Sequence, residues 1–421
     1  MADLIASGSS ERAAPATAGR VAQAHHQARR SLGLAAAFAL AAPVAWLLPH
    51  ETGGWLPLHL FLVGALLMAI SGATQMLAVT WSSSPAPAPS LATAQRWVLA
   101  AGAVVVAAGR EADMDALTAA GGAAVAAGLV LLAAILLGIR RTAVTDRYQP
   151  AIDVYLTALA FGVVGVLLGV AIGTGAVTDR WAAVRDAHLT VNVFGLVGLV
   201  IVGTIPFFVA TQARTKMSRA ATPARVRGTG AAAAAATATA AAGHLLEVPL
   251  LAAAGLGAYV VALGATVALL PRLRRRQLDW AGPRLVQLGA GLAWWAGTTA
   301  VLAVQVATEH HDRSAVLRAL AIGGFAQILA SALAYLGPVV RGGGHRSLTA
   351  GFALTGSWLS VAAANVAAAG ALVDQPRVLA AGIGVWAVDS AQRAVRLTAS
   401  RAGGGRPPTS SRPTTADPTP T

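Results

Sequence analysis

The sequence contains no cysteine, a single lysine (Lys216) and few charged residues. The absence of cysteine excludes disulfide bonds, thiolate metal sites, iron–sulfur clusters and cysteine nucleophiles. Any metal would therefore be held by histidine, methionine, carboxylate or backbone groups. Charged residues make up 11% of the 421 positions, whereas soluble domains carry about 25%. Combined with 56% hydrophobic residues, this shortage is typical of a polytopic membrane protein.

Several catalytic motifs are also missing. No hydrolase nucleophile elbow, P-loop, paired-histidine zinc motif or dinucleotide fingerprint occurs in a usable context. The sequence leaves open whether the protein is an enzyme. The net charge of +14 would suggest nucleic acid as the partner of a soluble protein. Here the basic residues stand in short loops between apolar segments, so membrane topology explains the charge, and the expected partner is the lipid bilayer and no nucleic acid.

Long apolar segments predict an all-α bundle of about twelve transmembrane helices, since a spanning helix needs about 20 apolar residues. Two alanine-rich segments, 96–109 and 229–243, are weaker, because alanine forms helices well but is nearly neutral towards lipid. The clear segments are 31–49, 56–81, 117–139, 151–175, 187–211, 249–270, 285–306, 315–338, 348–372 and 377–396.

The distribution of arginine supports all twelve segments. With the N-terminus inside, 25 of the 31 basic residues fall on the inner side. Omitting 229–243 would move the arginines of 272–276 outside, against the positive-inside rule. We therefore expect both termini in the cytoplasm. Abundant alanine and arginine are typical of a GC-rich bacterial genome, which indicates a bacterial plasma membrane. The basic residues expected outside are Arg110, Arg180, Arg185, Arg313, Arg318 and Arg377.

Composition divides the chain into three parts. The membrane domain covers 31–398. Residues 1–30 are rich in Ala, Ser and Arg, and residues 399–421 are basic and rich in Pro and Thr. Both are predicted to be disordered cytoplasmic tails. The Arg29-Arg30 pair also resembles a secretory signal, but the inner flank of a first helix is favoured because many more apolar segments follow.

Three of the predicted helices resemble one another. They begin near Leu58, Ala187 and Arg318, have glycines one to two turns in, and end in an aromatic residue or proline. Their spacing of four helices predicts a threefold repeat of four-helix units. Glycines in such helices also allow close helix packing without any repeat.

Polar residues inside the predicted helices are few. Asp389 and Arg393 stand four residues apart in the last helix, which predicts an ion pair. Amide side chains in membrane helices usually hydrogen-bond to a neighbouring helix. Those of this chain are Gln75, Asn192, Gln327 and Asn365.

The histidines gather on the predicted outer side. Imidazole binds transition metals and haem iron. His59 and His188 begin the second and sixth helices at the same predicted depth and are the main cofactor candidates; the alternative is a headgroup-level histidine bonded to a loop. The outer histidines are His50, His59, His188, His244, His310 and His311.

Weaker metal candidates lie in the outer loops. His244 shares a short loop with Glu247, and the pair His310-His311 stands beside acidic residues. These residues predict either weak surface binding of copper or zinc, or simple hydration.

With twelve helices, the four-helix repeat and these two histidines, the chain resembles the haem-copper oxidase subunit I superfamily and NnrS-type membrane proteins. It is most similar to the membrane domain of actinobacterial proteins labelled copper oxidases, in the segments His59 to Gly64 and Ala187 to Thr204. The resemblance implies that His59 is an axial haem ligand and His188 a second one. It also implies a redox or cupredoxin partner at the outer face.

The chain departs from that superfamily in its tenth helix, where Arg318 to Val340 contains no histidine, and in lacking a tyrosine after His188 in the sixth. A dioxygen-reducing centre is therefore not expected. The prediction is a membrane protein that binds haem or copper near its outer face for electron transfer, metal handling or nitric oxide response. Two alternatives stay open: a secondary transporter of the twelve-helix class, and a cofactor-free scaffold.

Overall fold

The computed structural model describes residues 10–342 and 344–400, with side chains from Gly19 onward. This part of the chain is helical and contains no strand, which confirms the predicted all-α class. Ten helical stretches are long and apolar enough to cross a membrane. Large apolar side chains on the flanks face outward, among them Leu250, Val261 and Val304, each more than half exposed. Such a surface is suited to lipid contact.

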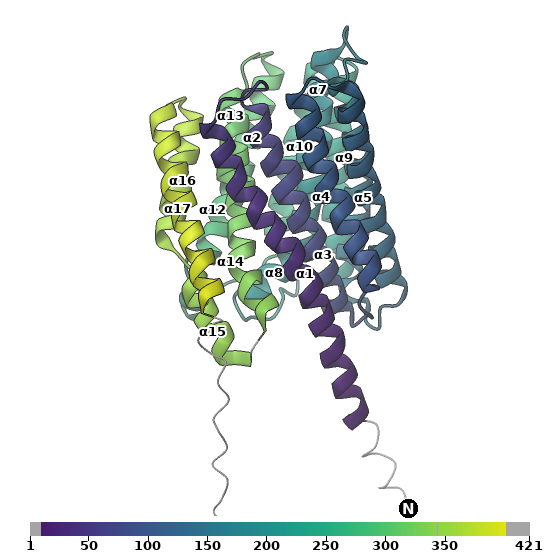
Figure 1. The fold of residues 1–421 in the computed structure, drawn as a ribbon, viewed down its shortest axis with the longest axis vertical. Coiled ribbons are helices and arrows are strands. Elements are labelled where there is room, and N and C mark those ends of the chain that lie inside the picture. Colours follow the sequence, from purple (N-terminus) through teal and green to yellow (C-terminus); the bar gives the residue numbers. More distant parts are fainter. Residues whose placement is uncertain (1–9, 343, 401–421) are drawn as a thin grey trace, which may run out of the picture.

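The helices run up and down in a bundle (Figure 1). The first third of the chain consists of α1 (Ser10–Leu47), α2 (Trp55–His59), η1 (Leu60–Leu66), α3 (Leu67–Ser82), α4 (Pro89–Glu111) and α5 (Asp115–Arg141). The second third consists of η2 (Asp146–Tyr148), α6 (Gln149–Gly173), α7 (Trp181–Thr190), η3 (Val191–Gly198), α8 (Leu199–Gln212), α9 (Pro223–Leu245) and α10 (Pro249–Val267). The last third consists of α11 (Arg275–Ala281), α12 (Pro283–Ala307), α13 (Ser314–Ala319), η4 (Leu320–Ala326), α14 (Gln327–Arg341), α15 (Gly344–Thr355), α16 (Trp358–Leu372) and α17 (Pro376–Ala399).

Helix α1 begins and α17 ends at the same end of the bundle (Figure 1). We call this the terminal end; it carries the loops 83–88, 142–145, 213–222 and 268–274. The opposite end carries the loops 48–54, 112–114, 174–180, 246–248, 308–313 and 373–375. The loops predicted to lie outside are those of the opposite end.

The two segments left uncertain by hydropathy behave differently. Segment 96–109 lies within α4, which is one of the ten apolar helices. Segment 229–243 lies within α9, a helix of 23 residues that is not among the ten. The clear candidate 377–396 lies within α17, a helix of 24 residues that is not among them either. A helix of this length reaches about 35 Å, so α9 and α17 are long enough to cross but not apolar enough to qualify by composition.

The first helix differs from the prediction of a disordered tail over 1–30. Helix α1 starts at Ser10, and residues 1–9 lie outside the described residues, as do residues 401–421 of the predicted C-terminal tail. The extension packs against the 83–88 loop. The Arg20 guanidinium donates to the Ser83 carbonyl, and the amides of Gln23 and Gln27 donate to the Pro87 carbonyl at 3.1 and 3.0 Å. These long-range contacts hold an alanine-rich segment of high helix propensity in place.

Three hairpins of helices share one geometry. The pairs α4–α5, α9–α10 and α16–α17 make the most extensive helix contacts of the described chain. In each pair, a glycine of the first helix contacts the backbone of the second helix, at the residue nine positions further along the chain. A second glycine, twelve positions after the first, lies on the second helix and contacts the backbone of the first helix. A Cβ atom at Gly109 would lie 2.6 Å from the Thr118 nitrogen, so only glycine permits this approach. The glycines are Gly109 and Gly121, Gly243 and Gly255, and Gly370 and Gly382.

The tips of these hairpins are also alike. An acidic residue with positive φ follows each first helix: Asp113 at 50°, Glu247 at 56° and Asp374 at 53°. The next residue donates its backbone N–H to the carbonyl of the first glycine, at 2.8 Å in all three hairpins. This is the hydrogen-bond pattern that closes a helix with a left-handed residue.

The three spans beginning at Trp55, Trp181 and Ser314 form the centre of the bundle. In their most apolar stretches of 18 residues, 56%, 89% and 61% of the residues are buried, against 22–44% in the other seven spans. Each contains a π-helical segment, η1, η3 or η4, whose fifth residue is glycine. The fifth-position glycines Gly64 and Gly195 pack on Phe38 of α1 and Phe161 of α6. In η4, Gly323, which is the fourth residue, packs on Trp294 of α12.

Polar contacts between the helices agree with the sequence. Arg393 and Asp389 form the predicted ion pair at 2.9 Å. Asn365 of α16 accepts a hydrogen bond from the Trp294 indole of α12 at 2.7 Å, and Gln327 of α14 donates to it at 3.5 Å. The predicted role of these amides as contacts between helices is confirmed at Gln327 and Asn365.

The glycine contacts predict a stability difference within one helix. A leucine at Gly121 would bring its Cβ within 2.5 Å of the Val106 nitrogen, whereas Gly138 of the same helix has nothing within 4 Å. We expect Gly121→Leu to lower stability by about 1–3 kcal/mol or more through overpacking, and Gly138→Leu to leave it nearly unchanged. The midpoint of thermal unfolding in detergent measures both. Equal midpoints for the two variants would contradict the backbone contact.

Candidate functional site

His59 and His188 precede the π-helical segments of two central spans. His59 is the last residue of α2, directly before η1, and His188 lies in α7, three residues before η3. Irregular helical turns of this kind occur frequently at functional sites. Relative to the π-helical glycine, His59 stands five residues before Gly64 and His188 seven before Gly195. Measured from these glycines, the two histidines were predicted at the same depth but differ by two residues, which is about 3 Å of helical rise.

The His59 ring is fixed by Trp55, one turn earlier. The ring stacks on the indole with centroids 3.9 Å apart and planes 20° apart. Its Nδ1 lies 3.0 Å from the Trp55 carbonyl oxygen. Because a carbonyl only accepts hydrogen bonds, Nδ1 carries the hydrogen in this contact. The neutral ring then presents a lone pair at Nε2, the form in which imidazole ligates a metal.

His188 is held in the same way by a different helix. Its Nδ1 lies 2.7 Å from the Gly165 carbonyl oxygen of α6. The ring occupies a notch in α6, since a Cβ at Gly169 would lie 2.6 Å from His188 Cε1. Asn192 donates from Nδ2 to the His188 backbone carbonyl at 2.8 Å. With the hydrogen on Nδ1, the neutral His188 ring also has its lone pair at Nε2.

The two histidines face one environment. His188 and Arg110 are both within electrostatic range of His59. Across residues 19–342 and 344–400, neither Nε2 has a hydrogen-bond partner. Backbone carbonyls that fix Nδ1–H are the usual support of metal-ligating imidazoles, because they set the tautomer and the ring orientation. The fold thus orients two imidazole rings from two central spans, each with its Nε2 unpaired among the described residues.

The loop histidines lie apart from this pair. His244 ends α9 near an ion-paired group in which Asp186 binds Arg313 at 2.9 Å and Arg185 at 2.7 Å. The His310 backbone carbonyl accepts from Arg313 Nε at 3.0 Å, and His311 is exposed. In the described part of the chain, no three His, Cys, Asp or Glu residues gather as metal ligands. The structure thus offers the predicted loop metal site no set of three ligands.

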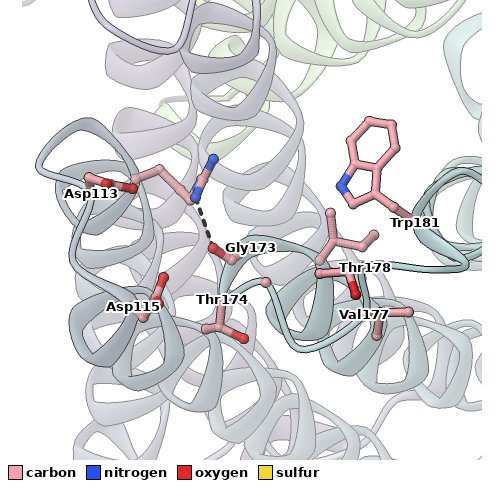
Figure 2. A pocket seen from close by; sticks show the side chains of 10 residues that line it. Asp113, Asp115, Gly173, Thr174, Val177, Thr178 and Trp181 are labelled. Atoms are coloured by element: carbon pink, nitrogen blue, oxygen red, sulfur yellow. Dashed lines mark hydrogen bonds between the residues drawn. The ribbon is translucent and has the colours of Figure 1, made fainter.

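A pocket of about 430 Å³ opens at the opposite end, between the loops 112–114 and 174–180 (Figure 2). Arg110 donates to the Gly173 carbonyl at 2.8 Å across it. Asp113 and Asp115 stand on one side and the Trp181 indole on the other (Figure 2). Neither His59 nor His188 lines this pocket. The pocket was not predicted from the sequence, because the residues that line it come from two parts of the chain that are far apart in the sequence.

Comparison with known proteins adds no relative. No protein-family profile matches the sequence, and no curated protein is significantly similar to it. The class of the protein therefore rests on its own structure, a helical bundle with ten helices of membrane-spanning length and composition.

The loop before α2 is expected to respond to pH. The His50 ring contacts the carbonyl oxygens of Leu48 and Gly53 through its two nitrogens. Both contacts are hydrogen bonds only when both nitrogens carry hydrogen, as in imidazolium. The bond to Leu48, then the bond to Gly53 and the Glu111 carboxylate, raise the pKa of His50. This stabilisation is full below about pH 6.5 and is lost as the pH rises through the raised value.

We therefore expect amide hydrogen exchange in residues 48–55, corrected for its intrinsic pH dependence, to increase as the pH rises from about 6 to 8. In His50→Gln the corrected exchange should not depend on pH. A wild-type protein with the same corrected exchange at both pH values would rule out this switch.

Proposed function

We propose that the protein is a twelve-span membrane protein of the bacterial plasma membrane that binds haem through His59 and His188 near its outer face. Its architecture would be that of the haem-copper oxidase subunit I and NnrS-type proteins, with three four-helix units. The observation that carries the proposal is the shared state of the two rings. Each commits Nδ1 to a backbone carbonyl, at 3.0 and 2.7 Å, and leaves Nε2 available.

The hairpin geometry supports three repeated units. The third and fourth helices of each unit meet through glycines at one register, and the second helix of each carries a π-helical segment with a glycine at its fifth position. The segments 109–121, 243–255 and 370–382 agree in sequence as well. Each begins and ends in glycine, has an acidic fifth residue and places two alanines before the last glycine. Counting α9 and α17 as spans gives each unit four helices.

The charge distribution supports the orientation. The arginine-rich loops 213–222 and 268–274 lie at the terminal end, and both histidines lie towards the opposite end. By the positive-inside rule the terminal end faces the cytoplasm. The cofactor would then lie near the outer face, within reach of a redox partner outside the cell.

The ligand set favours haem over copper. His59 and His188 would hold a haem through their Nε2 atoms, and two histidines are enough protein ligands for that cofactor. A zinc or copper site built from protein alone usually takes three or four ligands, and no group of three gathers among the described residues. A haem bound by these residues would supply single-electron transfer. The residues here orient the ligands: the carbonyls of Trp55 and Gly165 fix both tautomers, and Gly169 leaves room for the His188 ring.

The absorption spectrum of the protein purified in mild detergent tests this proposal, together with its iron and copper content. We expect a Soret band and bound iron in the wild-type protein. His59→Ala and His188→Ala should lose the band or shift it to that of a singly ligated haem, because one axial bond is removed. His311→Ala, an exposed histidine of the same end, should keep the wild-type spectrum.

The other outcomes separate the alternatives. If the protein contains copper but no iron, and both alanine variants lose the copper, the haem proposal is wrong and His59 and His188 bind copper. A colourless, metal-free protein, after expression with added haem precursor, would overturn the proposal. It would leave the transporter and scaffold hypotheses, which uptake assays in proteoliposomes distinguish.

A further inference from the structure

Arginines are buried at the terminal end in two different states. The Arg393 side chain, 13% exposed, pairs with Asp389 at 2.9 Å and donates to the Thr355 carbonyl at 2.7 Å. Arg284 at the start of α12 is only 3% exposed, and among residues 19–342 and 344–400 no carboxylate pairs with it. A buried charge is costly unless an opposite charge and hydrogen bonds compensate it. Arg393 has that compensation, whereas the described residues around Arg284 provide none.

The surroundings of Arg284 leave its charge uncompensated. Its Nη1 and Nη2 donate to the carbonyls of Phe352 and Trp280 at long distances of 3.3 and 3.4 Å. Its Cζ lies 4.2 Å from the Phe352 ring centroid. Its Nε is buried without a hydrogen-bond partner. The groups within electrostatic range are Tyr335 and a second cation, Arg214.

Arg214 approaches the same place from the surface. It follows α8 with a positive φ of 49°, and its side chain is exposed. Its Cζ lies 3.6 Å from the Trp280 ring centroid, and its Nη2 is 3.5 Å from His345 Nδ1. The Trp280 and Phe352 rings meet edge to face, with centroids 6.2 Å apart. This aromatic frame holds two guanidinium groups near each other although their charges repel.

We propose that Arg284 and Arg214 form a binding site for a phosphate group at the terminal end of the bundle. Guanidinium groups present forked N–H donors that match phosphate oxygens, and an anion here would satisfy Arg284 Nε and offset both charges. The short helices α11 and α15 supply Trp280 and His345, and Leu278 of α11 is 45% exposed. Apolar and aromatic side chains beside arginines are typical of a membrane boundary, where the headgroup of an anionic phospholipid is the nearest phosphate. The site is independent of the haem proposal.

Thermal unfolding of the full-length protein in neutral detergent tests this site. The protein is titrated with phosphatidylglycerol, with phosphatidylcholine or with inorganic phosphate, and the midpoint shift gives an apparent affinity. We expect phosphatidylglycerol to raise the midpoint more than phosphatidylcholine. Arg214→Gln and Arg284→Met should each weaken the response about tenfold, because each removes charge-assisted hydrogen bonds. Arg219→Gln, which removes one exposed charge from the same end, should respond like the wild type.

Two variants keep the test decisive. Arg214 is exposed, so Arg214→Gln should fold even if Arg284→Met does not; the methionine replaces a buried charge by an apolar chain, which proteins often tolerate. A response to inorganic phosphate that both variants lose, with phosphatidylglycerol no better than phosphatidylcholine, would keep the site and assign it to a soluble phosphate. Equal responses of Arg214→Gln, Arg219→Gln and the wild type would overturn the proposal, as would a wild type that responds to neither anion.

Discussion

Backbone contact between neighbouring helices is the constraint on which the bundle depends. Lipid provides no hydrophobic force that drives one apolar helix against another, so association relies on close packing. Glycines at matching positions let the pairs α4–α5, α9–α10 and α16–α17 touch backbone to backbone. Because the glycines have the same spacing in all three pairs, the same backbone contact sets the position of the helices in three parts of the chain. Helices poor in large apolar side chains, α9 above all, are held by this contact.

The central spans turn that packing into a site. Their π-helical segments set glycines against Phe38 and Phe161 of the preceding helices, and the residues just before these segments include His59 and His188. The notch at Gly169 accepts the His188 ring, the one at Gly165 accepts the Asn192 side chain, and the Gly165 carbonyl fixes the tautomer of His188. The feature that packs two helices closely therefore also orients the His188 ring. Removing either glycine would disturb both functions at once.

The two ends of the bundle treat charge differently. At the opposite end, hairpin-tip acids meet arginines near the start of the adjacent span: Glu247 binds Arg180 at 3.1 Å and Asp374 binds Arg318 at 2.6 Å. At the terminal end arginines outnumber acids, and Arg284 is buried beside another cation. Ion pairs form at the terminal end as well, where Asp153 binds Arg140 at 2.6 Å and Arg227 at 2.9 Å, but Arg284 takes part in none of them. That difference fits a protein that meets anionic lipid on one side.

The sequence by itself determined what depends on local pattern. Hydropathy over some twenty residues is enough to find a spanning helix, and spacing by four residues is enough to pair Asp389 with Arg393, so both were predictable. The sequence repeat is clearer in segments 109–121, 243–255 and 370–382 than in the three central helices from which it was predicted. Tertiary structure alone decided the features that need distant residues. These are the anchoring of residues 20–27 on the 83–88 loop, the carbonyl of Gly165 that selects the tautomer of His188, and the absence of a carboxylate partner for Arg284 among the described residues. Each depends on which helix lies next to which, and side-chain packing in three dimensions sets that arrangement.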